Sequence, residues 1–168
     1  MKKIVIRHYE SPCGELLLGA FEGQLCLCDW RQREKRERVD KRLQKALNAI
    51  YTEGSDATID SAVQQLDEYF SGKREKLEIP LLLVGTDFQR AVWNELLQIP
   101  YGTTLSYSHV AQNMGKRKSV RPLASAIGAN ALSVFVPCHR VIGSDRSLTG
   151  YAGGLDAKQW LLELEKAL

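Results

Sequence analysis

The spacing of apolar residues changes near residue 84, and this change constrains the fold more than any other feature of the chain. Before it, apolar residues form short runs or alternate with polar ones between turn residues, as they do in β-strands. After it, most apolar residues recur every three or four positions, which is the period of an α-helix. The sequence therefore predicts a fold of the α+β class in two domains, residues 1–83 and 84–168.

Three short strands are predicted at the start of the first domain. Apolar residues cluster at 4–6, 16–18 and 25–28, and the turn residues Ser11-Pro12-Cys13-Gly14 and Glu22-Gly23 separate these clusters. Proline and glycine favour tight turns, and strands joined by tight turns pair antiparallel. We therefore expect a small antiparallel sheet.

Two amphipathic helices and one further strand complete the prediction for the first domain. Residues 32–50 are mostly charged, with apolar residues at helical spacing up to Ile50. A second helix is predicted from Asp60 to Phe70 and is ended by Ser71-Gly72. Residues 77–84 are predicted to form one more strand.

The second domain is predicted to be mostly helical. Thr86 and Gln89 have the spacing of a capping box, which predicts a helix that ends at Pro100-Tyr101-Gly102. A last amphipathic helix is predicted over 156–168.

Two helices of the second domain are predicted to form a helix-turn-helix. Ser106 is expected to cap a helix that runs to Asn113, and Ser119 to cap a helix over 120–129. Between them lies the short basic turn Gly115-Lys116-Arg117-Lys118. Short helices joined by a glycine-containing turn are typical of this DNA-binding motif.

The excess of positive charge lies in the second domain. The net charge is +3, and residues 1–83 carry 14 basic and 14 acidic side chains, whereas residues 84–168 carry 9 and 6. Such a local excess favours a polyanionic partner. No apolar run approaches the roughly 20 residues needed to cross a bilayer. The composition therefore fits a polyanionic partner and gives no sign of a membrane protein.

The cysteines indicate a reducing compartment. Cys13, Cys26, Cys28 and Cys138 are irregularly spaced, which suits the cytoplasm better than a disulfide scaffold. Cys26 and Cys28 share a strand face, with His8 and Cys13 not far along the chain, but the spacing fits no standard zinc pattern. We interpret these thiols as core residues and predict no metal site.

Cys138 is the candidate nucleophile. It follows a predicted short buried strand, Ser133–Val136, and precedes His139. A cysteine reacts as its thiolate, which a neighbouring imidazole favours, and Pro137 restricts the backbone that aims the sulfur. Adjacent residues of a regular strand face opposite sides, so the two side chains can cooperate only if the backbone turns here, as Gly143 nearby makes plausible. A buried structural thiol beside an unrelated histidine is the alternative.

Several motifs of the second domain occur together and in order. They are Phe88-Gln89-Arg90-Ala91-Val92-Trp93, Ile99-Pro100-Tyr101-Gly102, Ser106-Tyr107, Pro137-Cys138-His139-Arg140-Val141-Ile142-Gly143, Thr149-Gly150-Tyr151-Ala152-Gly153-Gly154-Leu155 and Lys158-Gln159-Trp160-Leu161-Leu162. Together they resemble the O6-alkylguanine-DNA alkyltransferase family, and the resemblance covers 86–165. The first domain matches only loosely, through Ser11-Pro12, Gly14 and its order of strands and helices. The resemblance implies a ribonuclease-H-like first domain and a DNA-binding and alkyltransferase second domain.

The resemblance implies direct reversal of DNA damage. An alkylated guanine would be flipped out of the duplex, and Cys138 would attack its alkyl carbon once, without turnover. His139 would take the thiol proton through a water, and Glu165 would orient the imidazole. Tyr107 would donate a hydrogen bond to guanine N3.

Further site residues are implied by the same resemblance. The N–H of Ala152 would serve the O6 oxygen, and the carbonyls of Cys138 and Val141 would read the exocyclic amine. Arg121 would fill the gap left by the flipped base, and Asn130 would link its helix to the nucleophile.

The remaining expectations concern DNA and substrate range. Ser119, Lys116, Arg117 and Lys118 would contact DNA without reading its sequence. Some family members have proline where Ser133 stands, so the pocket here is expected to be roomier. The expected partner is double-stranded DNA containing O6-alkylguanine, with O4-alkylthymine as a further candidate, and we expect a monomer without cofactors.

Three other functions fit parts of the sequence. Alkyltransferase-like proteins bind damaged DNA without chemistry, but they lack the cysteine. A helix-turn-helix regulator would not need Pro137-Cys138-His139-Arg140, and a cysteine hydrolase would turn over. Transfer from S-adenosylmethionine is disfavoured because no strand is followed by a glycine-rich cofactor loop.

Individual residues have structural alternatives as well. Glu165 could lie on a solvated helix face, and Tyr107 could be a packing residue. Arg140 could bind phosphate or form a structural salt bridge.

Overall fold

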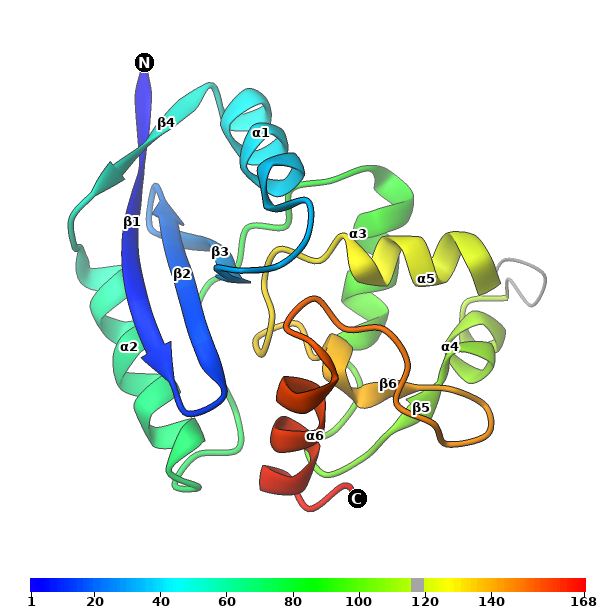
Figure 1. Ribbon diagram of the computed structural model, residues 1–168. Helices are drawn as coiled ribbons and strands as arrows, with labels where there is room; N and C mark the ends of the chain where they lie inside the picture. Colours follow the sequence, from blue (N-terminus) through cyan, green and yellow to red (C-terminus); the bar gives the residue numbers. More distant parts are fainter. Residues whose placement is uncertain (116–119) are drawn as a thin grey trace. The chain divides into compact units, whose positions relative to one another are not determined.

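The computed structural model describes residues 1–115 and 120–168, and the chain divides into two units, Met1–Val84 and Gly85–Leu168. A sheet and two helices form the first unit, and the second is mostly helical (Figure 1). The expected α+β class is confirmed. No helix among the described residues has both the length and the apolar character needed to cross a membrane.

The first unit is built on a four-stranded sheet. Strands β1 (Lys2–Ser11), β2 (Gly14–Phe21) and β3 (Gln24–Trp30) form the predicted antiparallel arrangement. Strand β4 (Ala49–Glu53) pairs parallel with β1, so the order is β3-β2-β1-β4. Strand β4 was not predicted.

The first helix is shorter than the sequence predicts because Asn48 ends it. Helix α1 (Arg36–Leu47) stops where Asn48 takes a left-handed φ of 47° and donates its N–H to the carbonyls of the preceding turn. Asparagine tolerates this conformation, which is a common helix terminus. The chain then continues as β4, where Ala49 is buried and Ile50 is 46% exposed. The prediction that the helix reaches Ile50 is therefore wrong.

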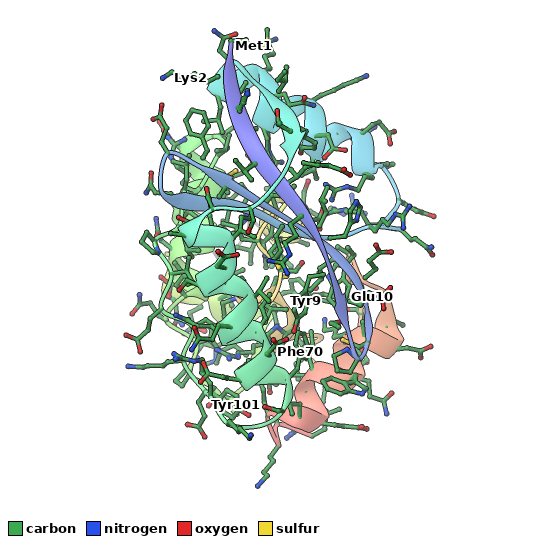
Figure 2. All side chains as sticks on the ribbon, turned by 90° about the vertical axis from the view of Figure 1, so that its left-hand side faces the viewer. Met1, Lys2, Tyr9, Glu10, Phe70 and Tyr101 are labelled. Atoms are coloured by element: carbon green, nitrogen blue, oxygen red, sulfur yellow. The ribbon has the colours of Figure 1, made fainter. Side chains whose placement is uncertain are left out.

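Helix α2 (Ala57–Phe70) packs against the three antiparallel strands. Asp56 caps it by accepting the N–H of Ile59 at 2.8 Å. Tyr9 of β1 stacks on Phe70 with ring centroids 6.2 Å apart, and Figure 2 shows the two side chains beside one another. This packing places the core of the first unit between α2 and the sheet.

Residues 77–84 do not form the predicted strand. Within this segment only Leu81 makes a bridge, parallel to Leu25 of β3. The N–H of Leu25 donates to Pro80 O at 2.8 Å, and Leu82 N–H donates to Leu25 O at 2.9 Å. Proline has no N–H to donate to a strand ladder, so Pro80 works against a longer strand.

The second unit holds most of the helices and one small sheet. Its elements are α3 (Asp87–Leu96), β5 (Leu105–Ser106), α4 (Tyr107–Asn113), α5 (Val120–Gly128), the 3-10 turn η1 (Cys138–Arg140), β6 (Val141–Ile142) and α6 (Leu155–Leu164). Helix α5 packs against α3 and α4, and α6 packs against η1. Strands β5 and β6 pair in parallel, which was not predicted.

The predicted caps Thr86 and Ser106 are confirmed, whereas α2 starts at Ala57, after its cap Asp56, and not at Asp60 as predicted. Thr86 and Gln89 form a reciprocal capping box on α3, and Ser106 accepts the N–H of His109 on α4. Gly115, after α4, has a φ of +69°, which glycine adopts without strain. The predicted cap Ser119 and the basic turn 116–118 lie outside the described residues.

Candidate active site

The segment before Cys138 is buried but is not the predicted strand. Residues 133–136 form turns, Val134 has a left-handed φ of 72°, and the N–H of Val136 donates to Leu132 O at 2.8 Å. A left-handed conformation is unfavourable for a β-branched residue and persists only where surrounding contacts fix it. The strand prediction fails because the backbone bonds within its own segment rather than to a neighbouring strand.

Asn130 supplies contacts that fix this segment. Its Oδ1 accepts the N–H of Leu132 at 2.9 Å, and its Nδ2 donates to Val136 O at 3.0 Å and to the sulfur of Cys138 at 3.3 Å. The side chain is 3% exposed. Asn130 lies two residues after α5, so it joins the end of that helix to Cys138.

Cys138 and His139 lie on a turn of the backbone rather than on a strand. They begin η1, where Arg140 N–H donates to Pro137 O at 3.0 Å. Both side chains are buried. The turn that cooperation between them requires is therefore present.

His139, Arg140 and Glu165 form a buried hydrogen-bonded group. Glu165 Oε2 lies 2.8 Å from His139 Nε2 and accepts from Arg140 Nη2 at 2.9 Å, while Oε1 accepts from Arg140 Nε at 2.8 Å. Arg140 Nη1 also donates to Ile99 O at 2.7 Å. Glu165 is 1% exposed, which excludes the solvated-face interpretation. Arg140 has the structural salt-bridge role that the sequence left open.

These contacts set the protonation of the group. Burial alone would raise the pKa of Glu165, but hydrogen bonds from His139 and Arg140 lower it to about 2. Burial lowers the pKa of His139, although Glu165 opposes this shift. An ionised Glu165 can only accept, so the proton of a neutral His139 is on Nε2. His139 Nδ1 is buried and has no hydrogen-bond partner among the described residues, so it can receive a proton.

Tyr107 begins α4 and is half-buried. Its hydroxyl donates to Thr149 O at 3.4 Å. Burial raises the pKa of Tyr107, although the Thr149 hydrogen bond lowers it in part. The phenol therefore keeps its proton at neutral pH and remains a hydrogen-bond donor.

Lys158 of α6 is a buried residue that the sequence analysis missed. Its Nζ donates to Val141 O at 2.7 Å, Thr149 O at 2.9 Å and Gly150 O at 3.4 Å. Burial lowers the pKa of Lys158 to about 8, and the nearby Cys138 opposes this shift. The seven-residue spacing to Glu165 places both on one helix face, a signal that could have indicated its position.

The other predicted site residues lie at different depths. Val141 is buried in β6, and Ala152 is half-buried in the loop before α6, where its N–H meets no acceptor in the part of the chain that the structure describes. Arg121 is exposed in the first turn of α5. Lys116, Arg117 and Lys118 are not among the described residues.

The thiols of the first unit are in its core or close to it. Cys26 and Cys28 are buried in β3, and His8 pairs with Glu15 at 3.2 Å. Among residues 1–115 and 120–168, no three His, Cys, Asp or Glu side chains are grouped so that they could hold a metal ion.

Both parts of the chain match known family models. Residues 87–167 match the DNA binding domain of 6-O-methylguanine DNA methyltransferase, and residues 4–83 match its ribonuclease-like domain. A methylated-DNA–protein-cysteine methyltransferase of Methanosarcina barkeri is 41% identical over 94% of both chains. An inducible methyltransferase of the same kind from Bacillus subtilis is 51% identical over 61% of this chain and 57% of its own.

Solved structures agree with these sequence matches. The crystal structure of Mycobacterium tuberculosis OGT in complex with DNA has a TM-score of 0.82 and 38% identity, covering 96% of this chain and 92% of that one. A Methanococcus jannaschii O6-methylguanine DNA methyltransferase has a TM-score of 0.63 and 25% identity, with coverage of 96% and 92%.

Proposed function

Because this chain belongs to the 6-O-methylguanine DNA methyltransferase family, we propose that it repairs DNA directly, by transferring the alkyl group of an O6-alkylguanine to its own Cys138. The main support for the proposal is the arrangement of side chains around Cys138. Asn130 Nδ2 orients the sulfur at 3.3 Å, and the next residue is an imidazole held at 2.8 Å by Glu165. This is the nucleophile–base–orienter arrangement of covalent catalysis.

The proposed reaction forms one bond and breaks one. His139 Nδ1 takes the thiol proton through a water, and the sulfur of Cys138 attacks the alkyl carbon. The S–C bond forms as the bond from that carbon to guanine O6 breaks, and the electron pair leaves with guanine. Glu165 stabilises the resulting imidazolium. The thioether is stable, so each molecule reacts once.

Four groups are proposed to hold the flipped base. The Tyr107 hydroxyl is a donor that can reach guanine N3, and the Ala152 N–H can serve O6 as negative charge develops there. The carbonyls of Cys138 and Val141 would accept from the exocyclic amine. Each carbonyl oxygen has two lone pairs, so the bond from Lys158 to Val141 O does not prevent a second one.

Helix α5 is proposed to meet the DNA. Arg121 is exposed in its first turn, where a flat guanidinium can enter the base stack. Lys116, Arg117, Lys118 and Ser119 are proposed as contacts to the DNA backbone. The second domain, 84–168, would thus carry both DNA binding and chemistry, acting as a monomer in the reducing cytoplasm without a cofactor.

Intact-mass spectrometry tests the proposal. The protein is incubated with a short duplex containing O6-methylguanine, with Cys138→Ala as the control. We expect a gain of one methylene, about 14 Da, that stops at one equivalent and is absent from the variant. Catalytic turnover would favour a hydrolase, and an unchanged mass would favour a binding module, so either result contradicts the proposal.

A further inference from the structure

Lys158 is a buried cation without a carboxylate partner in the described part of the chain. Its ammonium group is surrounded by the carbonyls of Val141, Thr149 and Gly150, at 2.7, 2.9 and 3.4 Å. The residue is 0% exposed. Lysine is rarely buried in this way, because carbonyl dipoles replace water only in part, so a compensating anion is expected nearby.

Helix α6 contacts the reactive turn at two points. Lys158 and Glu165 are two helical turns apart, about 10.5 Å along one face, and this helix packs against η1. Glu165 binds His139 and Arg140 within the turn. Lys158 binds the carbonyl of the residue directly after it. The helix therefore presents an anion and a cation to the segment that carries Cys138.

The charges of this buried group favour an anion at Cys138. Lys158 and Arg140 are positive, Glu165 is negative, and His139 is neutral while Nδ1 lacks a proton. With a neutral thiol the group carries one net positive charge. Transfer of the thiol proton to His139 leaves this net charge unchanged but creates an anion at the sulfur. The ammonium group of Lys158 stabilises that anion, because opposite charges attract strongly in a region of low dielectric constant.

Lys158 also shares a carbonyl acceptor with Tyr107 of α4. Thr149 O accepts from Lys158 Nζ at 2.9 Å and from the Tyr107 hydroxyl at 3.4 Å. The loop that continues to Ala152 is therefore tied to α6 and α4 through one carbonyl. Loss of the ammonium group would therefore have two effects: it would release this loop, and it would remove a positive charge from the site.

We propose that Lys158 is a positioning residue of the alkyl transfer, which holds the 149–150 loop against the reactive turn and stabilises Cys138 as a thiolate. The inference rests on the proposed function and deepens it. The titratable groups that face Lys158 are Cys138 and His139 on η1 and, through Thr149 O, Tyr107 on α4. Alkylation of Cys138 removes the anion, so Lys158 is left as an uncompensated charge in the product.

The pH profile of Cys138 reactivity separates charge stabilisation from a purely structural role. Iodoacetamide is the probe, and its addition to the Cys138 peptide is followed by mass spectrometry in Lys158→Met, Lys158→Arg and, as a control, Lys166→Met, which changes an exposed lysine of the same unit. We expect Lys158→Met to slow the reaction about tenfold at neutral pH and to move its midpoint about one unit higher. Lys158→Arg keeps the charge and should retain the original midpoint, as should the control.

Two outcomes would overturn the inference. One is a Lys158→Met profile with the original midpoint, and the other is an equal shift in Lys158→Arg. Iodoacetamide reports on the sulfur without DNA. If the wild-type protein takes no methyl group from the duplex, the proposed function is contradicted. The effect of Lys158 on the reactivity of Cys138 toward iodoacetamide can still be interpreted.

A measurement on the wild-type chain covers the case in which Lys158→Met does not fold. The NMR chemical shift of the Lys158 ε-carbon is followed as a function of pH, before and after Cys138 has been blocked with iodoacetamide. We expect the midpoint of Lys158 to fall on blocking, because its anionic neighbour is lost. An unchanged midpoint would contradict the proposal.

Discussion

Glu165 serves two partners with one carboxylate, and this sharing defines its role. Its oxygens accept from His139 Nε2 and, in a bidentate manner, from Arg140. Arg140 compensates the charge of the carboxylate, so Glu165 acts toward His139 mainly by fixing the ring and its tautomer. His139 can then remain neutral in the resting protein, with Nδ1 ready to accept a proton.

Replacement of this carboxylate by an amide tests the orienting role. Glu165→Gln keeps the shape but allows the side chain to donate as well as accept, so His139 is no longer held in one tautomer. We expect single-turnover methyl transfer to slow by roughly a hundredfold, within the range of general acid–base contributions. DNA affinity should be unchanged in a binding assay, and a matching loss of affinity would contradict the orienting role.

The same carboxylate predicts how stability depends on acid. The pKa of Glu165 is lowered from 4.5 to about 2 in the folded chain. A lowered folded pKa gives stability that is complete above the unfolded value of 4.5 and is lost as the pH falls toward 2. Urea unfolding between pH 6 and pH 2.5 should therefore show a loss on the order of 3 kcal/mol that Glu165→Gln lacks. Parallel curves for the two proteins would contradict this assignment.

The sequence predicts single residues unevenly. Cys138 and His139 are indicated because a cysteine beside a histidine has chemical meaning within the surrounding motifs. Lys158 is not, because a lysine in an amphipathic helix is usually solvated, and its burial depends on carbonyls 8 to 17 positions away. Arg140 could be assigned to a salt bridge only once its partner 25 positions away was known.

At the scale of elements, local signals predict helix starts better than strands. Thr86 and Ser106 satisfy the first N–H groups of their own helices, so a few neighbouring residues contain the information. Asp56 caps α2 in the same way but was missed, because the prediction started that helix at Asp60. Strand β4 depends instead on pairing with β1, some 47 positions earlier. The segment 133–136 reads as a strand by composition, yet the Asn130 side chain and a left-handed Val134 make it a turn.

The capping box on α3 gives a prediction at this scale. Thr86→Ala removes the acceptor for the N–H of Gln89, so the folded chain should lose about 1 kcal/mol of unfolding free energy. Thr86→Ser keeps the oxygen and serves as the matched control. Urea denaturation of both variants provides the measurement, and equal losses would show that the hydroxyl does not stabilise the helix.

For the whole molecule, charge and chemistry are concentrated in the second half of the chain. Residues 84–168 carry the basic excess and every proposed site residue. In this half, binding to DNA and reaction at Cys138 are expected to depend on different residues. Arg121 is exposed on α5, whereas the sulfur of Cys138 is buried and accepts a hydrogen bond from Asn130. Substitutions on α5 should therefore affect access to the base rather than reactivity of the thiol.

Arg121→Ala tests this separation. The flat guanidinium is proposed to replace the flipped base in the stack, and unstacking a base costs a few kcal/mol, so its loss should slow methyl transfer from duplex at least about tenfold. Reaction with the free base O6-methylguanine needs no flipping and should keep the wild-type rate. Arg121→Lys retains the charge but not the planar group, and Arg146→Gln removes one charge from an exposed loop residue of the same unit. If stacking matters, Arg121→Lys should lose as much rate on duplex as Arg121→Ala, and Arg146→Gln should keep the wild-type rate. Equal losses of rate on duplex and on free base would show that Arg121 does not assist flipping.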